Sequence, residues 1–519
     1  MSKPALANRT KNRPLVLFWH LLAGAFASLS LPPLFLLPAI FALAIPFLAY
    51  LKAESRMQAF MIFGAAGTGW FLASTYWVSH SLIVVSPSLL VLAPFMALAL
   101  ALILALFWAS AAMISWSFGR RPVARLFWLV AFFSLSEWAR GFVATGFPWN
   151  LTGSLFAVDL ASLQAASVIG AYGLCVIALF FALVPAFWVL GHRRFAAIFL
   201  ILPLALAAFG AVRLANLSDG HSASSGSMIR LVQPAIPQAD KWDRSKRQLH
   251  LDRLVSLSRQ GDAVPKLVIW PETAFAGFAS RSQSLLDTTI RNATQNDGVV
   301  ITGIPRFGDG RTLLNSAIMM NHDGAIKAVY DKRHLVPFGE YMPFRKWLPI
   351  LEPIVGPIDF VPGENNRLMR LDGYGSMKML ICYEVIFAGA VIDQEIRPDM
   401  MINITNDAWF GQSAGPWQHL VQAQMRAVEE GLPLMRVANT GITAGFDSYG
   451  RILGQIGLGT QGVLDLPVPP ALPPTLFARF GNLGFFALIF LIIGSAACLD
   501  LFRSIRQKIS STRNLGTQP

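Results

Sequence analysis

Long apolar blocks occupy most of the first 215 residues of this chain, and one more lies near its end. Short polar segments or prolines separate the blocks, and Pro32-Pro33 divides the first two. A helix that crosses a bilayer needs roughly 20 apolar residues, a length that most of the blocks approach or exceed. We therefore expect eight spans, at 14–31, 34–51, 57–79, 89–117, 124–140, 161–190, 195–214 and 478–502.

The middle of the chain has a different pattern. From 228 to 466, short runs rich in β-forming residues alternate with stretches of mixed polarity. This alternation is typical of an α/β domain with layered sheets and helices outside them. We predict helices at 243–259 and 283–296, and strands within MIRLVQP, KLVIWPE, VVITGIP, SAIMMN, MKMLICYEV, MMINITND and ITAGFDSYG.

Together the two patterns predict a multi-span α-helical membrane domain joined to an α/β domain. The expected parts are a membrane domain with seven spans at 1–215, an α/β domain at 228–466, a proline-rich linker at 467–477, a last transmembrane helix at 478–503 and a polar tail at 504–519. Composition agrees, because only 14% of the residues are charged, against roughly 25% in soluble proteins.

Basic residues lie in alternate loops of the predicted membrane domain. They are Lys3, Arg9, Lys11, Arg13, Lys52, Arg56, Arg120, Arg121, Arg125, Arg193, Arg194, Arg503, Arg506 and Lys508. The loops at 31–33, 80–88 and 141–160 contain no Lys or Arg. Under the positive-inside rule both termini are cytoplasmic and residues 216–477 lie outside. Much of the net charge of +13 thus faces lipid headgroups, and we expect no nucleic-acid partner.

The run MLICYEVIF, residues 379–387, predicts a buried strand that two reactive residues interrupt. Side chains alternate along a strand, so Cys382 and Glu384 are expected to share a face. Cys175 and Cys498 lie in predicted spans, which leaves Cys382 without a disulfide partner in the α/β domain. A lone thiol in an oxidising compartment favours a chemical role over a structural one.

Other chemically useful residues also follow predicted strands. Glu272 comes after KLVIWP, and the loop YDKRHLVPFGEYMPF contains Lys332 and Glu340. A carboxylate, an amine and a thiol from three segments can form a set of base, orienting group and nucleophile. The eight histidines have no ligand spacing, so we expect no metal and no cofactor.

Several segments resemble a known family. IWPET, DKRHLVPFGEYMPF, ICYEV and NDAWFG resemble the Glu–Lys–Cys site of the nitrilase superfamily. The surrounding membrane frame resembles its membrane-embedded branch, the apolipoprotein N-acyltransferases. Further matching segments are QPAIPQADKW, SEWARGFVATGFPWN, GPWQHL and ANTGITA. The resemblance covers nearly the whole chain in order and implies a nitrilase-like αββα sandwich for the α/β domain.

The resemblance also implies a role for each site residue. Cys382 is the expected nucleophile, Glu272 the general base and Lys332 the electrostatic partner. Glu340 and Glu384 are expected to orient Lys332 and Cys382. Chemistry agrees with this assignment, since a thiol with a pKa near 8.5 is mostly protonated at neutral pH and needs a base.

The backbone N–H of Tyr383 is a candidate donor to the oxyanion, as in related triads. Trp242 and Trp409 are candidate substrate-loop and pocket-wall residues. Glu137 and Arg140 are candidate contacts to a lipid headgroup. The apolar segment 338–362 is expected to cover the site and exclude water.

Structural alternatives remain open for several of these residues. Glu384 could hold a strand end, and Tyr383 could be ordinary strand packing. Trp242 and Trp409 could belong to the core, and Glu137 and Arg140 could simply pair at the membrane edge. His419 fits a structural role better than that of a base, because the triad already has one.

The implied reaction transfers an acyl chain between lipids and proteins. The donor is a phospholipid whose sn-1 acyl chain forms a thioester with Cys382. The acceptor is the α-amino group of the diacylglyceryl-cysteine at the N-terminus of an apolipoprotein, in the last step of lipoprotein maturation. The implied location is the bacterial inner membrane, with the catalytic domain in the periplasm, and we expect a monomer.

Two other functions were weighed against this one. A membrane-tethered nitrilase-type amidase acting on a small periplasmic amide would use the same triad. It would not need the apolar cover or the EWARG…GFPWN segment beside a span. A transporter with an outer binding domain would leave Glu272, Lys332 and Cys382 unexplained, and its spans usually carry charges or broken helices.

Overall fold

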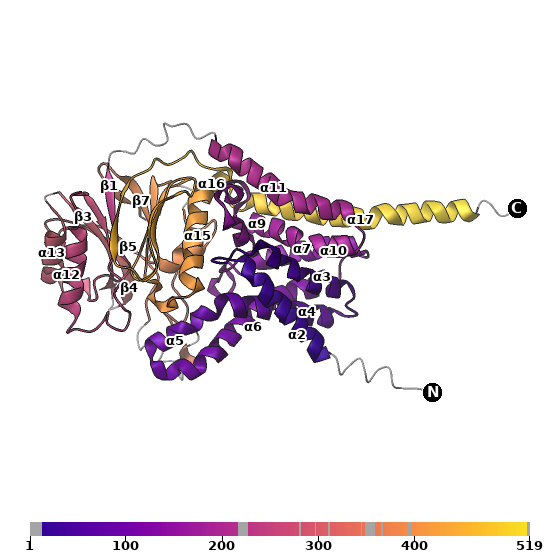
Figure 1. Ribbon diagram of the computed structural model, residues 1–519, viewed down its shortest axis with the longest axis horizontal. Helices are drawn as coiled ribbons and strands as arrows, with labels where there is room; N and C mark the ends of the chain where they lie inside the picture. The colour runs from indigo at the N-terminus through magenta and orange to yellow at the C-terminus, as the bar shows by residue number, and fades with distance from the viewer. Residues whose placement is uncertain are drawn as a thin grey trace.

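A helical part and a two-sheet domain lie side by side in the computed structural model (Figure 1). The structure describes residues 13–215, 227–279, 282–295, 297–309, 312–343, 345–347, 359–364, 367–392 and 396–515. Helices α11 (Arg193–Ala215) and α17 (Leu483–Leu515) run away from the sheets along the helical part. The described chain therefore separates into the two parts that the sequence patterns predict.

Helices occupy all eight predicted apolar blocks. Besides α11 and α17 they are α2 (Arg13–Ala27) with η1 (Ser28–Ser30), η2 (Leu37–Leu43) with α3 (Ala44–Leu51), α4 (Arg56–Thr75) with η3 (Tyr76–Ser79), η4 (Pro87–Leu92) with α6 (Ala93–Ser115), α7 (Pro122–Ala139), and α8 (Leu160–Leu163) with α9 (Ala166–Ala182) and α10 (Val184–Val189). Among the described residues, four segments are long and apolar enough to cross a membrane: Pro87–Ser115, Ala166–Val189, Arg193–Ala215 and Leu483–Leu501. The protein is thus a membrane protein with several apolar helices.

Helix α9 is broken near its start. Gly170 has a φ of +67°, which lies outside the helical region. A Cβ at this position would meet the ring of Phe477 at 2.2 Å. Only glycine combines this conformation with such close contact, so the break is where the helix α16 (Leu476–Phe480) docks.

Two six-stranded mixed sheets form the second domain. The first has the order β12 (Gly462–Pro467), β1 (Met228–Gln233), β2 (Leu267–Ile269), β3 (Val299–Phe307), β4 (Leu313–Asn321), β5 (Ile326–Asp331). The second has the order β11 (Ile452–Ile456), β10 (Thr443–Phe446), β9 (Leu434–Ala438), β8 (Met400–Thr405), β7 (Gly375–Ile381), β6 (Met369–Leu371). The central strands β1–β3 and β7–β9 pair in parallel, and the outer pairs are antiparallel.

The sheets pack face to face. One buried cluster joins side chains of both, including Leu231 and Ile301 from the first and Met379 and Ile402 from the second. The outer face of the first sheet packs on α12 (Arg247–Ser258) and α13 (Gln283–Ala293). That of the second packs on α15 (Ala414–Glu430). The layers therefore follow the order α, β, β, α, because each sheet buries both faces.

Helix α15 also joins the sheets to the membrane helices (Figure 1). The side-chain oxygen of Gln418 accepts hydrogen bonds from the indole N–H groups of Trp77 at 3.0 Å and Trp149 at 2.9 Å. Its amide nitrogen donates to the carbonyl oxygens of Pro32 and Ser74. A buried amide satisfied on both sides holds the two domains in one orientation.

Some expectations were incomplete. The strand predicted at 379–387 ends at Ile381, and residues 382–386 form a 3-10 turn, η12. Strands β5, β6, β9, β11 and β12 and helix α15 lie outside the predicted elements. In β9 the charged residue Arg436 interrupts a short apolar run. This strand could therefore be recognised only from its pairing with neighbouring strands in the structure. Helix α17 continues to Leu515, beyond the expected end at 503.

Candidate active site

Three strand ends bring the predicted triad together. Glu272 follows β2, Lys332 follows β5 and Cys382 follows β7. The ammonium nitrogen of Lys332 lies 3.9 Å from Oε1 of Glu272. All three residues are buried. Cys382 comes from the opposite sheet, so the site lies where the two sheets meet.

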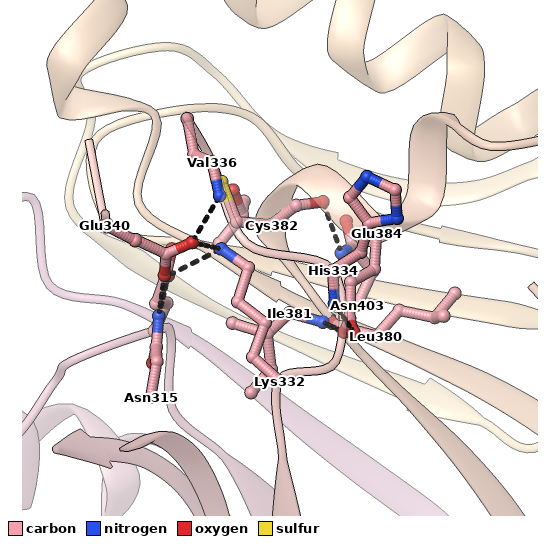
Figure 2. Close-up of polar contacts among 12 residues, drawn as sticks. Asn315, Lys332, His334, Val336, Glu340, Leu380, Ile381, Cys382, Glu384 and Asn403 are labelled. Carbon is pink, nitrogen blue, oxygen red and sulfur yellow. Dashed lines mark hydrogen bonds and ion pairs between the residues drawn. The ribbon is translucent and has the colours of Figure 1, made fainter. Parts of the chain in front are cut away.

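Glu340 anchors Lys332 on its other side. Oε2 of Glu340 lies 2.8 Å from Nζ of Lys332 and accepts the backbone N–H of Val336 at 2.7 Å (Figure 2). The amide nitrogen of Asn315 donates to Glu340 at 2.7 Å and to Glu272 at 2.8 Å. The predicted supporting role of Glu340 thus has a geometric basis. Asn315 was missed, although it directly precedes the predicted strand SAIMMN.

Cys382 occupies a strained turn at the end of β7. Its φ is +50°, in the left-handed region that residues with a Cβ rarely adopt. Strain of this kind persists only where neighbouring structure enforces it, and it is common at functional sites. The turn takes the chain out of the sheet at the reactive residue and directly opens η12.

A buried polar network behind the turn holds this conformation. The carbonyl oxygen of Cys382 lies 3.2 Å from Nε2 of His419 and 3.5 Å from the amide nitrogen of Asn403. Asp407 lies 2.9 Å from Nδ1 of His419 and 2.6 Å from Nη2 of Arg436. Burial, followed by the charge of Arg436, lowers the pKa of His419, which favours a neutral ring. His419 therefore supports the nucleophile turn, as its structural interpretation predicts.

Glu384 does not share a face with Cys382, which corrects the expectation from strand alternation. Because residues 382–386 form a turn, its carboxylate folds back to accept the backbone N–H of Ile381 at 2.7 Å (Figure 2). It also accepts the N–H of Arg333 at 2.8 Å and the hydroxyl of Tyr330, also at 2.8 Å. Glu384 thus ties the end of β7 to the loop that carries Lys332.

Burial and the neighbouring carboxylate favour the protonated thiol by raising the pKa of Cys382. Burial, and then Glu272, raise the pKa of Cys382, and Lys332 only partly opposes them. Burial also raises the pKa of Glu272. Although burial acts to lower it, Glu340 and Glu272 raise the pKa of Lys332, so its amine remains a cation. The arrangement favours removal of the thiol proton during attack rather than a preformed thiolate.

A pH profile of alkylation tests this assignment. Because the pKa of Cys382 is raised, we expect iodoacetamide to modify it more slowly than a free cysteine peptide at pH 7.5. The rate should still be rising at pH 9, above the ordinary thiol pKa of about 8.5. Peptide mass spectrometry at several pH values measures the rate at which Cys382 is alkylated. A plateau reached by pH 7 would instead indicate a stabilised thiolate.

A second lysine reaches the same site. Lys241 is buried, and its ammonium donates to the backbone carbonyl of Glu272 at 3.1 Å. Burial lowers its pKa to about 8, while Glu272 and Cys382 act in the opposite direction. The segment QPAIPQADKW was singled out, but only the adjacent Trp242 was named in it. The sequence could have indicated Lys241 as a site residue, because it lies in the segment QPAIPQADKW that matches the family.

The two predicted tryptophans do not belong to the core. The side chain of Trp242 is exposed, and Trp409 is at the margin of exposure. The carbonyl oxygen of Trp409 lies 3.4 Å from Nδ1 of His80, which precedes η4 on the helical part. In the expected cover 338–362, Phe338 is exposed, and residues 344 and 348–358 lie outside the described residues.

Glu137 and Arg140 form a buried pair. Their carboxylate and guanidinium groups are 3.0 Å apart, and both side chains have 1% exposure or less. Glu137 also accepts the indole N–H of Trp108 at 2.8 Å. Arg140 donates to the carbonyl oxygens of Phe147 and Trp149. The structure thus agrees with the simple pairing rather than with direct contact to a headgroup.

The loop that Arg140 holds reaches the active site. The carbonyl oxygen of Gly146 accepts the hydroxyl of Tyr383 at 2.6 Å, beside the nucleophile. The carbonyl oxygen of Thr145 lies 2.7 Å from Nε2 of His334, two residues beyond Lys332. The end of helix α7 therefore positions residues next to two members of the triad.

Replacing Arg140 by lysine tests this connection. Lysine keeps the positive charge, but its single amine cannot reproduce the planar guanidinium that contacts Glu137 and the carbonyl oxygens of Phe147 and Trp149 together. We expect a loss of about 2 kcal/mol of stability and acylation of Cys382 slowed several-fold. Arg125→Lys is the matched control, since Arg125 also donates to two carbonyls, those of Tyr50 and Leu51. Equal loss of acylation in both variants would contradict a specific role for the loop.

The described residues contain no group of three or more His, Cys, Asp or Glu side chains that could hold a metal ion. The candidate site itself contains carboxylates, two lysines and a thiol. A buried thiol beside a carboxylate and an ammonium can form and resolve an acyl intermediate.

Comparisons with known proteins agree with both parts of the chain. A family model described as carbon-nitrogen hydrolase matches residues 228–472. One described as apolipoprotein N-acyltransferase N-terminal domain matches residues 23–184. Among solved structures, that of Saccharomyces cerevisiae Nit3, a member of branch 10 of the nitrilase superfamily, aligns with 47% of this chain and 90% of its own, at 19% identity and a TM-score of 0.35. A match at that score identifies no function.

Full-length relatives decide the family. Proteins named apolipoprotein N-acyltransferase from Bradyrhizobium diazoefficiens and Rhodopseudomonas palustris are each 35% identical over 91% of this chain, and the matches cover 92% and 93% of their own lengths. The protein of that name from Brucella suis is 36% identical over 87% of this chain and 90% of its own. At this identity over helices and sheets alike, the chain belongs to the apolipoprotein N-acyltransferase family and is an acyltransferase.

Proposed function

We propose that this protein transfers an acyl chain from a phospholipid, through a thioester on Cys382, to the α-amino group of a diacylglyceryl-cysteine on an apolipoprotein. The observation that carries the proposal is the meeting of Glu272, Lys332 and Cys382 in a buried site beside apolar helices. Family membership supports the acceptor class. The phospholipid donor is proposed in addition, from the position of the site beside the apolar helices.

In the first half-reaction, the sulfur of Cys382 attacks the sn-1 ester carbonyl while Glu272 takes the thiol proton. The carbonyl oxygen becomes an oxyanion, which Lys332 stabilises. Tyr383 occupies the second position of η12, where backbone N–H groups have no partner within the turn. Its N–H is the proposed second donor. The C–O bond then breaks, Glu272 returns the proton to the leaving oxygen, and a lysophospholipid departs.

In the second half-reaction, the α-amino group of the acceptor attacks the thioester carbonyl. Glu272 accepts a proton from the attacking nitrogen, the C–S bond breaks, and Glu272 passes that proton to the leaving sulfur, which restores the thiol and the carboxylate. A thioester is more reactive than an amide, so the transfer runs downhill. Lys241, buried beside Glu272 with a pKa of about 8, adds positive potential where both tetrahedral intermediates carry negative charge.

Water must be kept from the thioester, because its hydrolysis would make the enzyme a phospholipase. Burial of Cys382 supports this exclusion. The exposed apolar side chains of Trp242, Phe338 and Trp409 are proposed to contact the acyl chains as they enter and leave. Apolar groups around a reactive centre also strengthen its electrostatic interactions.

The proposed topology has eight spans, with both termini in the cytoplasm and residues 228–466 in the periplasm of a bacterial inner membrane. Among the described residues, four helices that are long and apolar enough to cross a membrane support it, as do the helices at the other apolar blocks. So do the basic loops around Arg120 and Arg193, because positive loops remain on the cytoplasmic side.

The decisive test is the intact mass of the detergent-purified protein after incubation with one defined phospholipid and no acceptor. The proposal predicts a mass increase of one acyl chain, which neutral hydroxylamine removes. Addition of a diacylglyceryl peptide with a free N-terminus should then remove it and acylate the peptide.

A different result would favour the tethered amidase. That enzyme would leave the protein unmodified by phospholipid and would release ammonia from a small amide through the same thiol. Adduct formation without transfer to the peptide would retain the phospholipid donor but overturn the acceptor.

A further inference from the structure

A cavity of about 290 Å³ lies where the catalytic domain meets helix α16, just before the last span. Residues of the catalytic domain, among them Arg397 and Glu430, line one side, and Phe477 and Arg479 from α16 line the other. Glu272, Lys332 and Cys382 are not among its lining residues. Its volume approaches the lower end of the range for small-molecule pockets, about 300–1,000 Å³.

Two guanidinium groups meet at this cavity. Nη2 of Arg397 donates to the carbonyl oxygens of Glu430 at 2.7 Å and Leu472 at 3.1 Å, which holds the side chain in place. Nε of Arg479 donates to the carbonyl oxygen of Pro474 at 3.1 Å. Within the described residues, neither guanidinium forms a close ion pair with a carboxylate, although the charges of Arg397 and Glu430 attract each other. Further N–H groups on each are thus available to an anion, and a guanidinium pair suits a phosphate.

A buried carboxylate lines the same cavity. Glu430 is 4% exposed, and its side-chain oxygens accept no hydrogen bond from the described residues. Burial, and then its neighbour Glu429, raise its pKa to about 7. Buried polar groups normally have a partner. An unpartnered carboxylate that lines a cavity is therefore suited to a cationic donor from a ligand.

The surroundings of the cavity are those of a membrane surface. Leu476, Phe480 and Leu483 are exposed apolar residues around Arg479. Leu483 also begins the segment Leu483–Leu501, which is long and apolar enough to cross a membrane. Arginine beside exposed apolar residues at the start of a span is positioned at the depth of lipid headgroups. A lipid can place its headgroup in the cavity and its chains along α17.

We propose that this cavity binds an ethanolamine phospholipid headgroup, with the phosphate between Arg397 and Arg479 and the ammonium at Glu430. The site is separate from acyl transfer and does not depend on the mechanism proposed for Cys382. Because its residues come from both sides of the junction, the bound lipid links the catalytic domain to the last span. The ring of Phe477, which packs into the break at Gly170, extends this link to helix α9.

Native mass spectrometry of the full-length, delipidated protein at pH 8 tests the proposal. At this pH Glu430 is mostly ionised. All samples carry Cys382→Ala so that no covalent acyl adduct forms. Each is titrated with phosphatidylethanolamine, with phosphatidylglycerol, which has the phosphate without the ammonium, and with free phosphoethanolamine. Arg479→Gln and Glu430→Gln are compared with Arg291→Gln, which removes one exposed charge from α13.

We expect Arg479→Gln to weaken binding of both phospholipids about tenfold, since a charged hydrogen bond is lost. Glu430→Gln should weaken only phosphatidylethanolamine, by about tenfold, and Arg291→Gln neither lipid. Equal binding by all variants would overturn the site. Equal weakening of both lipids by Glu430→Gln would overturn the ammonium contact. Binding of free phosphoethanolamine as tight as that of the lipid would identify a soluble ligand instead of a lipid.

Discussion

Replacing Cys382 by alanine is expected to abolish the acyl adduct and to lower acyl transfer by about six orders of magnitude, as loss of a nucleophile does elsewhere. No other group at the site can form the thioester. Alanine has the same Cβ as cysteine, so the φ of +50° at this position adds no new strain. The variant should therefore fold, with a melting temperature within a few degrees of that of the parent.

Cys175→Ala is the matched control for this experiment. Cys175 is also fully buried, but it lies in helix α9 and its sulfur contacts the backbone N–H of Gly153. The control should lose a little packing energy and still form the adduct. Peptide mapping then assigns the modified residue. An acyl adduct that persists in Cys382→Ala would show that another nucleophile carries the chain.

Lys332→Met is expected to have the second-largest effect, on stability and on rate together. It leaves the Glu340 and Glu272 carboxylates buried without the ammonium that lies 2.8 and 3.9 Å from them. Removing one partner of a buried ion pair costs about 3–5 kcal/mol. Loss of the charge that stabilises the oxyanion should slow acylation about a thousandfold. Thermal unfolding and the time course of the intact mass measure the two effects.

The double variant Lys332→Met with Glu340→Gln separates these effects. Glutamine removes one buried negative charge and can still accept the N–H of Val336. Most of the stability should return, since the remaining repulsion is relieved. Acylation should remain slow, because the ammonium of Lys332 no longer faces the developing oxyanion. Recovery of the rate in the double variant would mean that Lys332 acts only by neutralising Glu340.

Local patterns correctly predicted that the apolar blocks form helices and where the central strands lie, for a physical reason. Whether a 20-residue block prefers lipid, or a short run prefers a sheet, depends mainly on its own side chains. Strands with charged residues needed more information. Arg436 is tolerated inside β9 only because Asp407 lies 2.6 Å from it, and that partner lies 29 residues earlier in the sequence.

The candidate triad could be proposed from the sequence because each member lies within a few residues of a strand end in a recognisable segment. Asn315 and Lys241 could not be assigned in the same way. Asn315 acquires its role by contacting Glu272 and Glu340 from a neighbouring strand. Lys241 acquires its role by being buried against the backbone of Glu272. Neither contact can be predicted from the residues that neighbour Asn315 or Lys241 in the sequence.

The sequence alone indicated the family, which the full-length relatives confirm. It also predicted the order of the membrane and α/β parts and the three candidate reactive residues. Tertiary structure decided how those residues are presented. The apolar run through Cys382 favours a continuous strand, yet the chain turns at φ +50° and Glu384 folds back onto Ile381. Likewise, Glu137 and Arg140 pair inside the protein rather than at lipid. Buried polar groups take the partners that the whole fold supplies, because leaving them unsatisfied costs more than a local conformational preference is worth.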